Sequence, residues 1–435
     1  MSHLRSALPL FIALIVAGDI AGIAAPVAPP AGVPPLDPIL KLPQYPVPTP
    51  NGYVVLEGLA KLNETHYLTG DIRGGRYYPP PQDAVTASIP AQLADNGAVL
   101  AELRRALGME WLYPHPPAPD MIFPEVTKAG YLGRLLVSEA ELLDQGGQTQ
   151  AAVKDALDVV TLGVKLPRGG GEHPWIVGAA FESMSFKALR RLTASHRLSL
   201  EALAKLREQL NRLEGQKSPL RESIAFEYEA QGPQSLRLSA AEFWRLSGGS
   251  PEFIPILKSP GADALTQDIV PQFLPKLMAW DAQLARLSTE SYFAIRDKIA
   301  TLPKDMASSD NAVVLQPVDA KTLQLQARSQ CYWRAARVMI GLELDRATRG
   351  KYADQLSQVK GLAAEDLQDP FSGKSLIYRP QGDGYVLYST GPDGKDHGGH
   401  RKFMPVTEGG DLMLWPDSPP QPSLPSPPSL PSPKT

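Results

Sequence analysis

Acidic side chains gather with glycines and histidines near the C-terminal end of the chain, around the stretch GPDGKDHGG at 391–399. Calcium binds about six to eight oxygen ligands in loose geometry, and carboxylates, hydroxyls and backbone carbonyls all supply such oxygens. We predict a calcium site here with Ser389, Asp393, Asp396 and Asp411 as ligands. Its role would be structural, because a bound ion offsets the entropy lost when a long glycine-rich loop becomes ordered.

The same segment has other interpretations. GPDG at 391–394 fits a type I β-turn, so turn chemistry alone accounts for most of the glycines. His397 and His400 offer an alternative transition-metal pair, although two histidines in a loop are weak evidence for one. A phosphate-binding loop at SGKS (372–375) is excluded, because Gln368 stands where the first glycine of that motif belongs.

A second candidate site lies in RGGGEHP (168–174), where Glu172 and His173 are neighbours. At the mouth of a cleft they could act as an acid and a base, which leaves a hydrolase as an alternative function. The glycines have a simpler explanation, since they can end one helix and release the next. Elsewhere the histidines lack metalloprotease spacing. The sequence therefore predicts a protein without catalytic residues.

Most of the chain between 92 and 349 has helical periodicity. In SLEALAKLREQLNRLEG (199–215), Ser199 is a predicted N-cap and Gly215 a predicted left-handed C-cap. The leucines predicted to form one buried stripe are Leu200, Leu203, Leu206, Leu210 and Leu213. Further helices are predicted for 176–194, 220–230, 265–287 and 323–349.

Two of the predicted helices form an antiparallel hairpin. Gly146 and Gly147 join AGYLGRLLVSEAELLDQ to TQAAVKDALDVVTLGVKL, and the small residues Ala151, Ala152 and Ala156 suit close helix contact. The pair resembles one unit of the tetratricopeptide type. No period recurs along the chain, so the helical region is repeat-like without being a repeat array.

After residue 349 the pattern changes to short β-like runs. SLIYR and YVLYS read as a hairpin with Asp383 and Gly384 in its turn, and DLMLW (411–415) as a third strand. The predicted fold class is therefore mainly α, with repeat-like helical hairpins. A small C-terminal α+β module, made of a long helix plus an antiparallel sheet, completes it.

The N-terminal residues have the order of a secretory signal peptide. Arg5 precedes an apolar stretch at 7–18, and small residues allow cleavage after Ala24. Asp19 interrupts the apolar run before the ~20 residues that a spanning helix needs. Export is predicted in either case, to the periplasm or cell envelope, with an uncleaved membrane anchor as the alternative. The single cysteine, Cys331, is predicted to be a buried thiol.

Composition and pattern together divide the chain. The predicted divisions are a signal peptide or anchor at 1–24, a Pro-rich linker at 25–51, a helical domain at 52–320, the α+β module at 321–415 and a Pro-rich disordered tail at 416–435. The net charge of −3 and the lack of a dense basic patch argue against a nucleic-acid partner. Contact with a membrane is expected only through an uncleaved N-terminal segment.

The C-terminal region resembles the globular head of type II secretion major pseudopilins. The positions that match are Gly350, Tyr352, Asp369-Pro370, Tyr378, Tyr388-Ser389, Gly391, Asp393-Gly394, Gly398-Gly399 and Asp411. The resemblance implies a small Tyr-rich sheet and a calcium ion in the loop that contains Asp393. This sequence departs from the pattern at Ala353, where a proline is usual, and at Gly410. It departs again at His397, where an acid often stands.

The whole chain more closely resembles a family of large bacterial envelope proteins that share the helical region and the ending YS-x-GPDGKD-x-GG. No activity is established for that family. The sequence as a whole predicts a non-catalytic exported protein that is structural or protein-binding, with a protein partner in the envelope. A component of pilus or type II secretion assembly is the remaining alternative.

Overall fold

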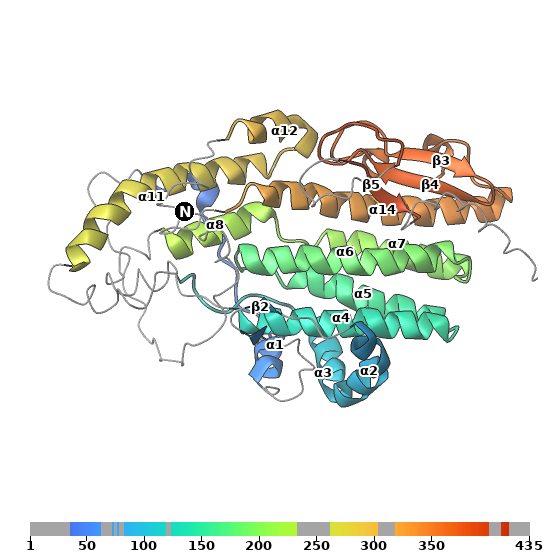
Figure 1. Cartoon of the computed structure of the whole chain (residues 1–435), viewed down its shortest axis with the longest axis horizontal. Coiled ribbons are helices and arrows are strands. Elements are labelled where there is room, and N and C mark those ends of the chain that lie inside the picture. The colour runs from blue at the N-terminus through green and yellow to red at the C-terminus, as the bar shows by residue number, and fades with distance from the viewer. Residues whose placement is uncertain are drawn as a thin grey trace, which may run out of the picture.

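The computed structural model describes residues 35–61, 72–73, 76–77, 82–118, 123–232, 262–302, 318–399 and 410–416. It is mainly helical with a small antiparallel sheet at its C-terminal end, which confirms the predicted fold class (Figure 1). The helices are α1 (Gly52–Lys61), α2 (Gln82–Asp95), α3 (Gly97–Leu107), α4 (Pro124–Gln145), α5 (Thr149–Lys165), α6 (Glu172–Ala194), α7 (Leu200–Glu214), α8 (Leu220–Gln231), α11 (Ala262–Leu287), α12 (Tyr292–Ala300), α14 (Lys321–Arg349) and α15 (Ala364–Leu367). The strands are β1 (Ile72–Arg73), β2 (Arg76–Tyr77), β3 (Ile377–Gln381), β4 (Gly384–Ser389) and β5 (Leu412–Trp415); short 3₁₀ turns are η1 (Pro38–Leu40) and η4 (Leu356–Gln358).

The predicted hairpin is formed by α4 and α5, with Gly147 in the left-handed conformation at their connection. Ala152 and Ala156 are fully buried, as close packing requires. Helix α5 also crosses α6 very closely. A Cβ atom on Gly163 would lie 2.8 Å from the carbonyl oxygen of Gly178, so only glycine allows this approach of the two backbones.

Helix α7 begins as predicted, because the side chain of Ser199 accepts a hydrogen bond from the backbone N–H of Ala202. Four of the five predicted leucines are buried, whereas Leu200, in the first helical position, is 53 % exposed. The predicted left-handed cap is wrong: Gly215 has φ −63°. The chain continues instead in a right-handed turn, in which the backbone N–H of Lys217 donates to the carbonyl of Glu214. Lys217 therefore lies immediately after the end of α7.

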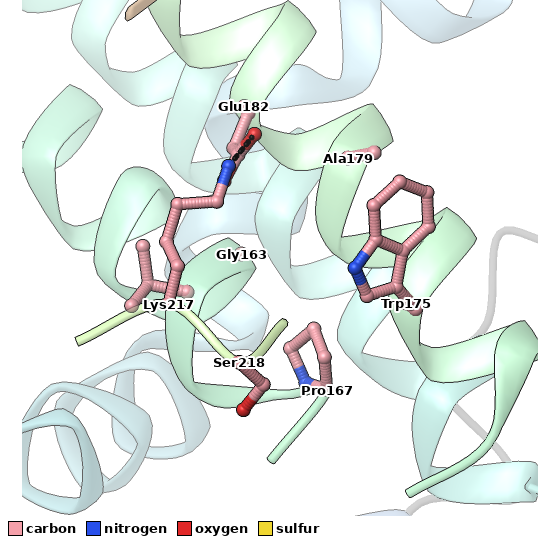
Figure 2. Close-up of a pocket in the computed structure, with 8 residues that line it drawn as sticks. Gly163, Pro167, Trp175, Ala179, Glu182, Lys217 and Ser218 are labelled. Carbon is pink, nitrogen blue, oxygen red and sulfur yellow. Dashed lines mark hydrogen bonds and ion pairs between the residues drawn. The ribbon is translucent and has the colours of Figure 1, made fainter. Parts of the chain in front are cut away.

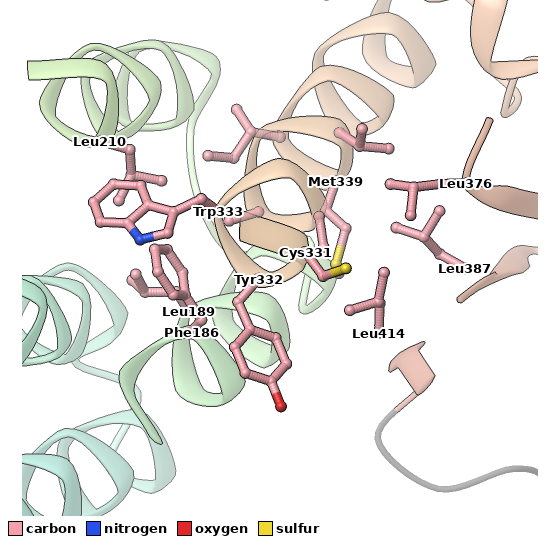
Figure 3. Packing of buried hydrophobic residues seen from close by; sticks show 14 of the residues in the cluster. Phe186, Leu189, Leu210, Cys331, Tyr332, Trp333, Met339, Leu376, Leu387 and Leu414 are labelled. Atoms are coloured by element: carbon pink, nitrogen blue, oxygen red, sulfur yellow. The ribbon is translucent and has the colours of Figure 1, made fainter. Parts of the chain in front are cut away.

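Helix α14 is buried around most of its circumference, because it lies between other helices and the C-terminal sheet (Figure 3). Trp333 faces Phe186 of α6 and Leu210 of α7, while residues on the other side of α14 face Leu387 and Leu414 of the sheet. All of these side chains belong to one hydrophobic core. The predicted division between residues 320 and 321 therefore separates segments that share a core.

The C-terminal sheet has the strand order β3-β4-β5 and is antiparallel throughout. Gln381 pairs with Gly384, so the two-residue turn consists of Gly382 and Asp383, one position earlier than predicted. Gly382 takes φ 57°, the left-handed conformation that such a turn needs. Strand β5 pairs with the end of β4, where Ser389 lies opposite Leu412.

Part of the predicted N-terminal linker is packed. Residues 35–51 run along the helices, and Leu40 is buried between α8 and α11. The side-chain amide of Asn51 donates to the carbonyl of Leu112 at 2.8 Å. Leu36, Tyr45 and Val47 in the same segment are exposed, so only some residues of 35–51, such as Leu40 and Asn51, are held against the helices.

Several predictions fall on residues that the structure does not describe. They are the signal peptide or anchor at 1–24, the linker as far as residue 34, His400 and the tail from residue 417. No helix within the described ranges is both long enough and apolar enough to cross a membrane.

The close crossing of α5 and α6 generates a stability prediction. Gly163→Ala should lower the free energy of unfolding by about 1–3 kcal/mol, because the added methyl group overlaps the backbone of α6. Gly58→Ala in α1 is the control, since a Cβ there meets nothing within 4 Å. It should stabilise the protein by up to about 1 kcal/mol. Urea unfolding of both variants distinguishes the effects, and equal changes would contradict the close crossing.

Candidate functional site

The carboxylate of Asp369 lies at the centre of the C-terminal module and is fully buried. Asp369 follows α15, at the start of the turn that leads into β3. Its hydrogen-bond donors come from two segments: Phe371 N (2.9 Å), Ser372 Oγ (2.9 Å), Ser389 Oγ (2.7 Å), Thr390 N (3.1 Å) and Thr390 Oγ1 (2.8 Å). All five donors are neutral. They stabilise a buried negative charge in the way that a cation would otherwise do.

Ser389, predicted as a calcium ligand, belongs to this network. Its hydroxyl donates to Asp369 and accepts a hydrogen bond from the backbone N–H of Gly391 at 3.1 Å. Both of its hydrogen-bonding directions are therefore used inside the module. Sequence reasoning did not assign Asp369 a role. The Asp-Pro pair was a signal for it, because an Asp before a turn often accepts N–H groups two residues on.

Asp411 and Asp393 lie on opposite sides of one imidazole ring, that of His397. Asp411 Oδ1 is 3.7 Å from His397 Nδ1, and Asp393 Oδ2 is 3.6 Å from His397 Nε2. Asp411 also accepts hydrogen bonds from the backbone N–H groups of His397 (3.0 Å) and Gly399 (2.7 Å). The carboxylate of Asp411 therefore ties residues 397–399 to the start of β5.

The carboxylate of Asp396 contacts a different set of neighbours. It accepts hydrogen bonds from Gly398 N at 2.8 Å and from the hydroxyl of Tyr388 at 2.9 Å. These two bonds, with the nearby guanidinium of Arg379, lower the pKa of Asp396. The structure thus brings Asp393 and Asp411 to one place, and directs Ser389 and Asp396 to two others.

Helix α12 contacts two segments of the C-terminal module: the loop that contains Asp393 and the turn that contains Pro370. Arg296 Nη1 donates to the backbone carbonyl of Asp393 at 3.2 Å, and the backbone N–H of Phe293 donates to the carbonyl of Pro370 at 3.2 Å. The ring of Phe293 also lies against Gly373, where a Cβ would come within 2.8 Å of it. The loop is therefore positioned by the helical region as well as by the sheet.

Two of the four predicted calcium ligands, Asp393 and Asp411, lie beside His397. Both carboxylates also accept backbone N–H groups, that of Asp393 from Lys395 and Gly410, and that of Asp411 from His397 and Gly399. Within the described ranges, no three Asp, Glu, His or Cys side chains are arranged to hold a metal ion. The Nδ1 atom of His397 is buried without a hydrogen-bond partner.

Cys331 is buried in α14, as predicted. Its Sγ lies 3.9 Å from Asp369 Oδ1. Burial, with the negative charge of Asp369, raises the pKa of the thiol well above its usual value. The thiol therefore stays protonated and acts as a further weak donor to the carboxylate.

Glu172 and His173, the candidate acid and base of a hydrolase, contact different neighbours. Glu172 lies beside Glu227, and its backbone N–H donates to Glu227 Oε1 at 2.7 Å. The ring of His173 instead stacks on Phe123, with the ring centroids 6.1 Å apart. The two side chains do not form a hydrogen-bonded pair.

A small cavity lies between α5, α6 and the connection from α7 to α8 (Figure 2). Trp175, Glu182 and Lys217 are among its lining residues, and Lys217 Nζ lies 2.7 Å from Glu182 Oε1. Lys217 also donates to the hydroxyl of Ser329 on α14 at 2.7 Å. The volume of about 10 Å³ has room for one water molecule at most, so this cavity does not admit a substrate.

No protein-family model, no curated protein and no solved structure matches this chain at a significant level.

The buried carboxylate of Asp369 generates a prediction. Asp369→Asn replaces one acceptor oxygen by an N–H₂ group that faces other donors, and should lower the free energy of unfolding by about 2–4 kcal/mol. Asp383→Asn makes the same chemical change at an exposed turn of the same module and should stay within about 0.5 kcal/mol of the parent protein. Equal stability of the two variants in denaturant unfolding would show that the network carries no stability.

Proposed function

We propose that this protein is a non-catalytic component of the bacterial envelope, exported from the cytoplasm, with a structural or protein-binding role. One observation carries the proposal. The polar side chains that could have done chemistry in the C-terminal module, Asp369, Ser389 and Asp411, are buried and bonded to neighbouring backbone and hydroxyl groups. Such side chains determine the shape of loops. They are not free to act on a substrate.

The shared core supports a binding role for the module as part of a larger rigid surface. Helix α14 contributes side chains to the helical layer and to the sheet, so the module cannot move as a separate head without breaking that core. A partner would therefore meet a sheet and loop whose positions are set by the helices behind them. The proposed partner is another protein of the envelope, and a component of pilus or type II secretion assembly is the alternative role.

Calcium is the ion that we propose to be bound by the carboxylates of Asp393 and Asp411. The ion would join residue 393 to residue 411 and so fasten the loop at both ends, in addition to the hydrogen bonds already made by Asp411. Two protein carboxylates are few for calcium, and His397 must turn aside for the ion to enter. Both facts predict weak affinity, about millimolar, as in extracellular calcium modules.

A hydrolase remains the second candidate, favoured by one observation. Burial, with the adjacent charge of Glu227, raises the pKa of Glu172 to about 8. A carboxyl group that is protonated near neutral pH can act as a general acid. The separation of Glu172 from His173 is the observation against that function.

The calcium proposal predicts the behaviour of the full chain in thermal unfolding. Millimolar calcium should raise the melting temperature relative to the same protein in a chelator, because the ion binds only the folded loop. His397→Asp should increase the shift and lower the calcium concentration needed, since it adds an oxygen ligand and removes the ring between the two aspartates.

Two further variants define the site. Asp393→Asn should abolish the calcium shift while it retains an acceptor for Lys395 N, and Asp396→Asn should leave the shift unchanged because Asp396 faces Tyr388. An identical melting temperature in calcium and in chelator, for the parent and for His397→Asp alike, would reject calcium as the ligand.

Export predicts a defined mature N-terminus. When the full chain is produced in a Gram-negative host, the protein recovered from the periplasm should begin at Ala25, as signal cleavage after Ala24 requires. N-terminal sequencing of the recovered chain measures this directly. A chain recovered only from the cytoplasm would contradict export. An intact apolar segment in the envelope fraction would instead favour the membrane anchor or the pilus component.

A further inference from the structure

The connection between α6 and α7 contains a backbone position with an unfavourable conformation. His196 has φ 58°, and within the described ranges it is the one residue other than glycine with a positive φ. A side chain with a Cβ atom is strained in this left-handed conformation, and the position after a helix is usually filled by glycine. Strain of this kind persists where contacts of the residue hold it in place, so it points to a role for the His196 ring.

The His196 ring contacts the carboxylate of Glu343 on α14, which is buried, with 3 % exposure. Both carboxylate oxygens already accept hydrogen bonds: Oε1 from the hydroxyl of Tyr352 at 2.5 Å, and Oε2 from Arg346 Nε at 3.1 Å. The ring of Tyr352 packs in turn on that of Tyr385 in β4, with the centroids 4.9 Å apart. We call His196, Glu343, Arg346 and Tyr352 the His196 cluster. It joins the α6–α7 connection to α14 and, through Tyr352, to the sheet.

One nitrogen of His196 has two neighbours with opposite requirements. Its Nδ1 lies 2.7 Å from Arg346 Nη2, which can only donate a hydrogen bond, and 3.0 Å from the acceptor Glu343 Oε2. A neutral ring with a lone pair on Nδ1 accepts from Arg346, and the lone pair then faces the negatively charged Oε2. A ring protonated at Nδ1 donates to Oε2, and its charge then repels the guanidinium. Either protonation state therefore satisfies one contact and weakens the other.

The other charged groups on the segments that meet at the His196 cluster have partners of their own. These pairs are Arg197 with Asp144 and Arg191 with Glu141 (both acids on α4), Arg349 with Asp345 on α14, and Lys351 with Asp354 after α14; the guanidinium of Arg190 lies over the ring of Tyr332. Burial, with the carboxylate of Glu343, raises the pKa of the Tyr352 hydroxyl, so this group remains a donor at neutral pH.

His196 is therefore the member of the cluster that can exchange a proton near neutral pH. Histidine is the side chain whose charge ordinarily changes between about pH 5 and pH 8. The His196 side chain is 44 % exposed, so protons reach it directly from solvent, whereas the Glu343 side chain is 3 % exposed. The Arg346 side chain is 32 % exposed, which gives its guanidinium room to move.

We propose that His196 is a proton-operated switch that selects the partner of the buried Glu343 carboxylate. With a neutral ring, Arg346 bridges Glu343 Oε2 and His196 Nδ1. When Nδ1 takes up a proton from solvent, His196 pairs with Oε2 and Arg346 Nη2 leaves the histidine. The guanidinium then turns toward solvent and the ring of Tyr352, whose centroid already lies 5.5 Å from Arg346 Cζ. The surface beside Tyr352 thus changes with pH, which goes beyond the fixed surface proposed above.

Nuclear magnetic resonance of the full chain with nitrogen-15-labelled histidine tests the switch, and His196→Asn identifies the signal of His196. Between about pH 5 and pH 9 the neutral ring should carry its proton on Nε2, because Nδ1 accepts from Arg346. The protonated ring should carry protons on both nitrogens. A neutral ring with its proton on Nδ1 cannot accept from Arg346 and would overturn the proposal.

Two variants separate the contacts of Nδ1. Arg346→Gln removes the cation and should raise the midpoint of the His196 titration by about one pH unit, whereas Glu343→Gln removes the anion and should lower it by about as much. Arg349→Gln is the matched control, because it removes a charge from the same end of α14 that pairs with Asp345 instead, and should leave the midpoint unchanged. Arg346→Gln lies at a partly exposed position, so the comparison still holds if Glu343→Gln does not fold. Equal midpoints in the parent, Arg346→Gln and Arg349→Gln would reject the switch.

A second measurement follows Arg346 itself. The signal of its Nε–H group, identified by its loss in Arg346→Gln, should shift with the same midpoint as the His196 ring, since the guanidinium changes partners when the ring gains its proton. An Arg346 signal that stays constant while His196 titrates would show that no exchange of partners takes place.

Discussion

The burial of one carboxylate, that of Asp369, is the constraint on which the C-terminal module depends. A charge without contact with water destabilises a protein unless donors surround it, and here five neutral donors from two segments must be in place together. The turn after α15 and the end of β4 therefore form as one unit. Because Ser389 belongs to that unit, the loop that begins at residue 390 leaves the sheet in a defined direction.

A second buried carboxylate, that of Asp411, closes the same loop from its other end. Asp411 bonds the backbone of His397 and Gly399, while α12 holds the carbonyl of Asp393. The loop is thus anchored to the sheet and to the helical region, and α14 joins those two parts through a common core. An arrangement of this kind suits a protein that presents a fixed surface, which is the role that we propose, and a weakly bound calcium ion would add to anchors that already exist.

Sequence periodicity predicts the long helices and the C-terminal strands, but it does not predict α1, β1, β2 or the partners of individual side chains. The leucine spacing of α7, the cap at Ser199 and the short β-like runs are local signals, and each led to the correct element. The exposure of Leu200 and the right-handed conformation of Gly215 depend on what surrounds the helix ends, which no local pattern records. The contacts of Leu40 and Asn51 depend on residues far away in the sequence, which the proline content of 35–51 does not indicate.

The candidate site shows the same limit. Acidic residues close in sequence were expected to face one ion, yet Asp396 turns to Tyr388 and Ser389 to Asp369, a residue 20 positions away along the chain. Of the four predicted ligands, Asp393 and Asp411 lie beside one ring, that of His397.

The most direct test of the account is amide hydrogen exchange at Phe371 and Thr390, whose N–H groups donate to the carboxylate of Asp369. If that buried charge holds the module together, both amides should exchange as slowly as the amide of Leu387 in the centre of β4. Rapid exchange at both, with β4 still protected, would show that the sheet forms without the Asp369 network and would contradict the central claim.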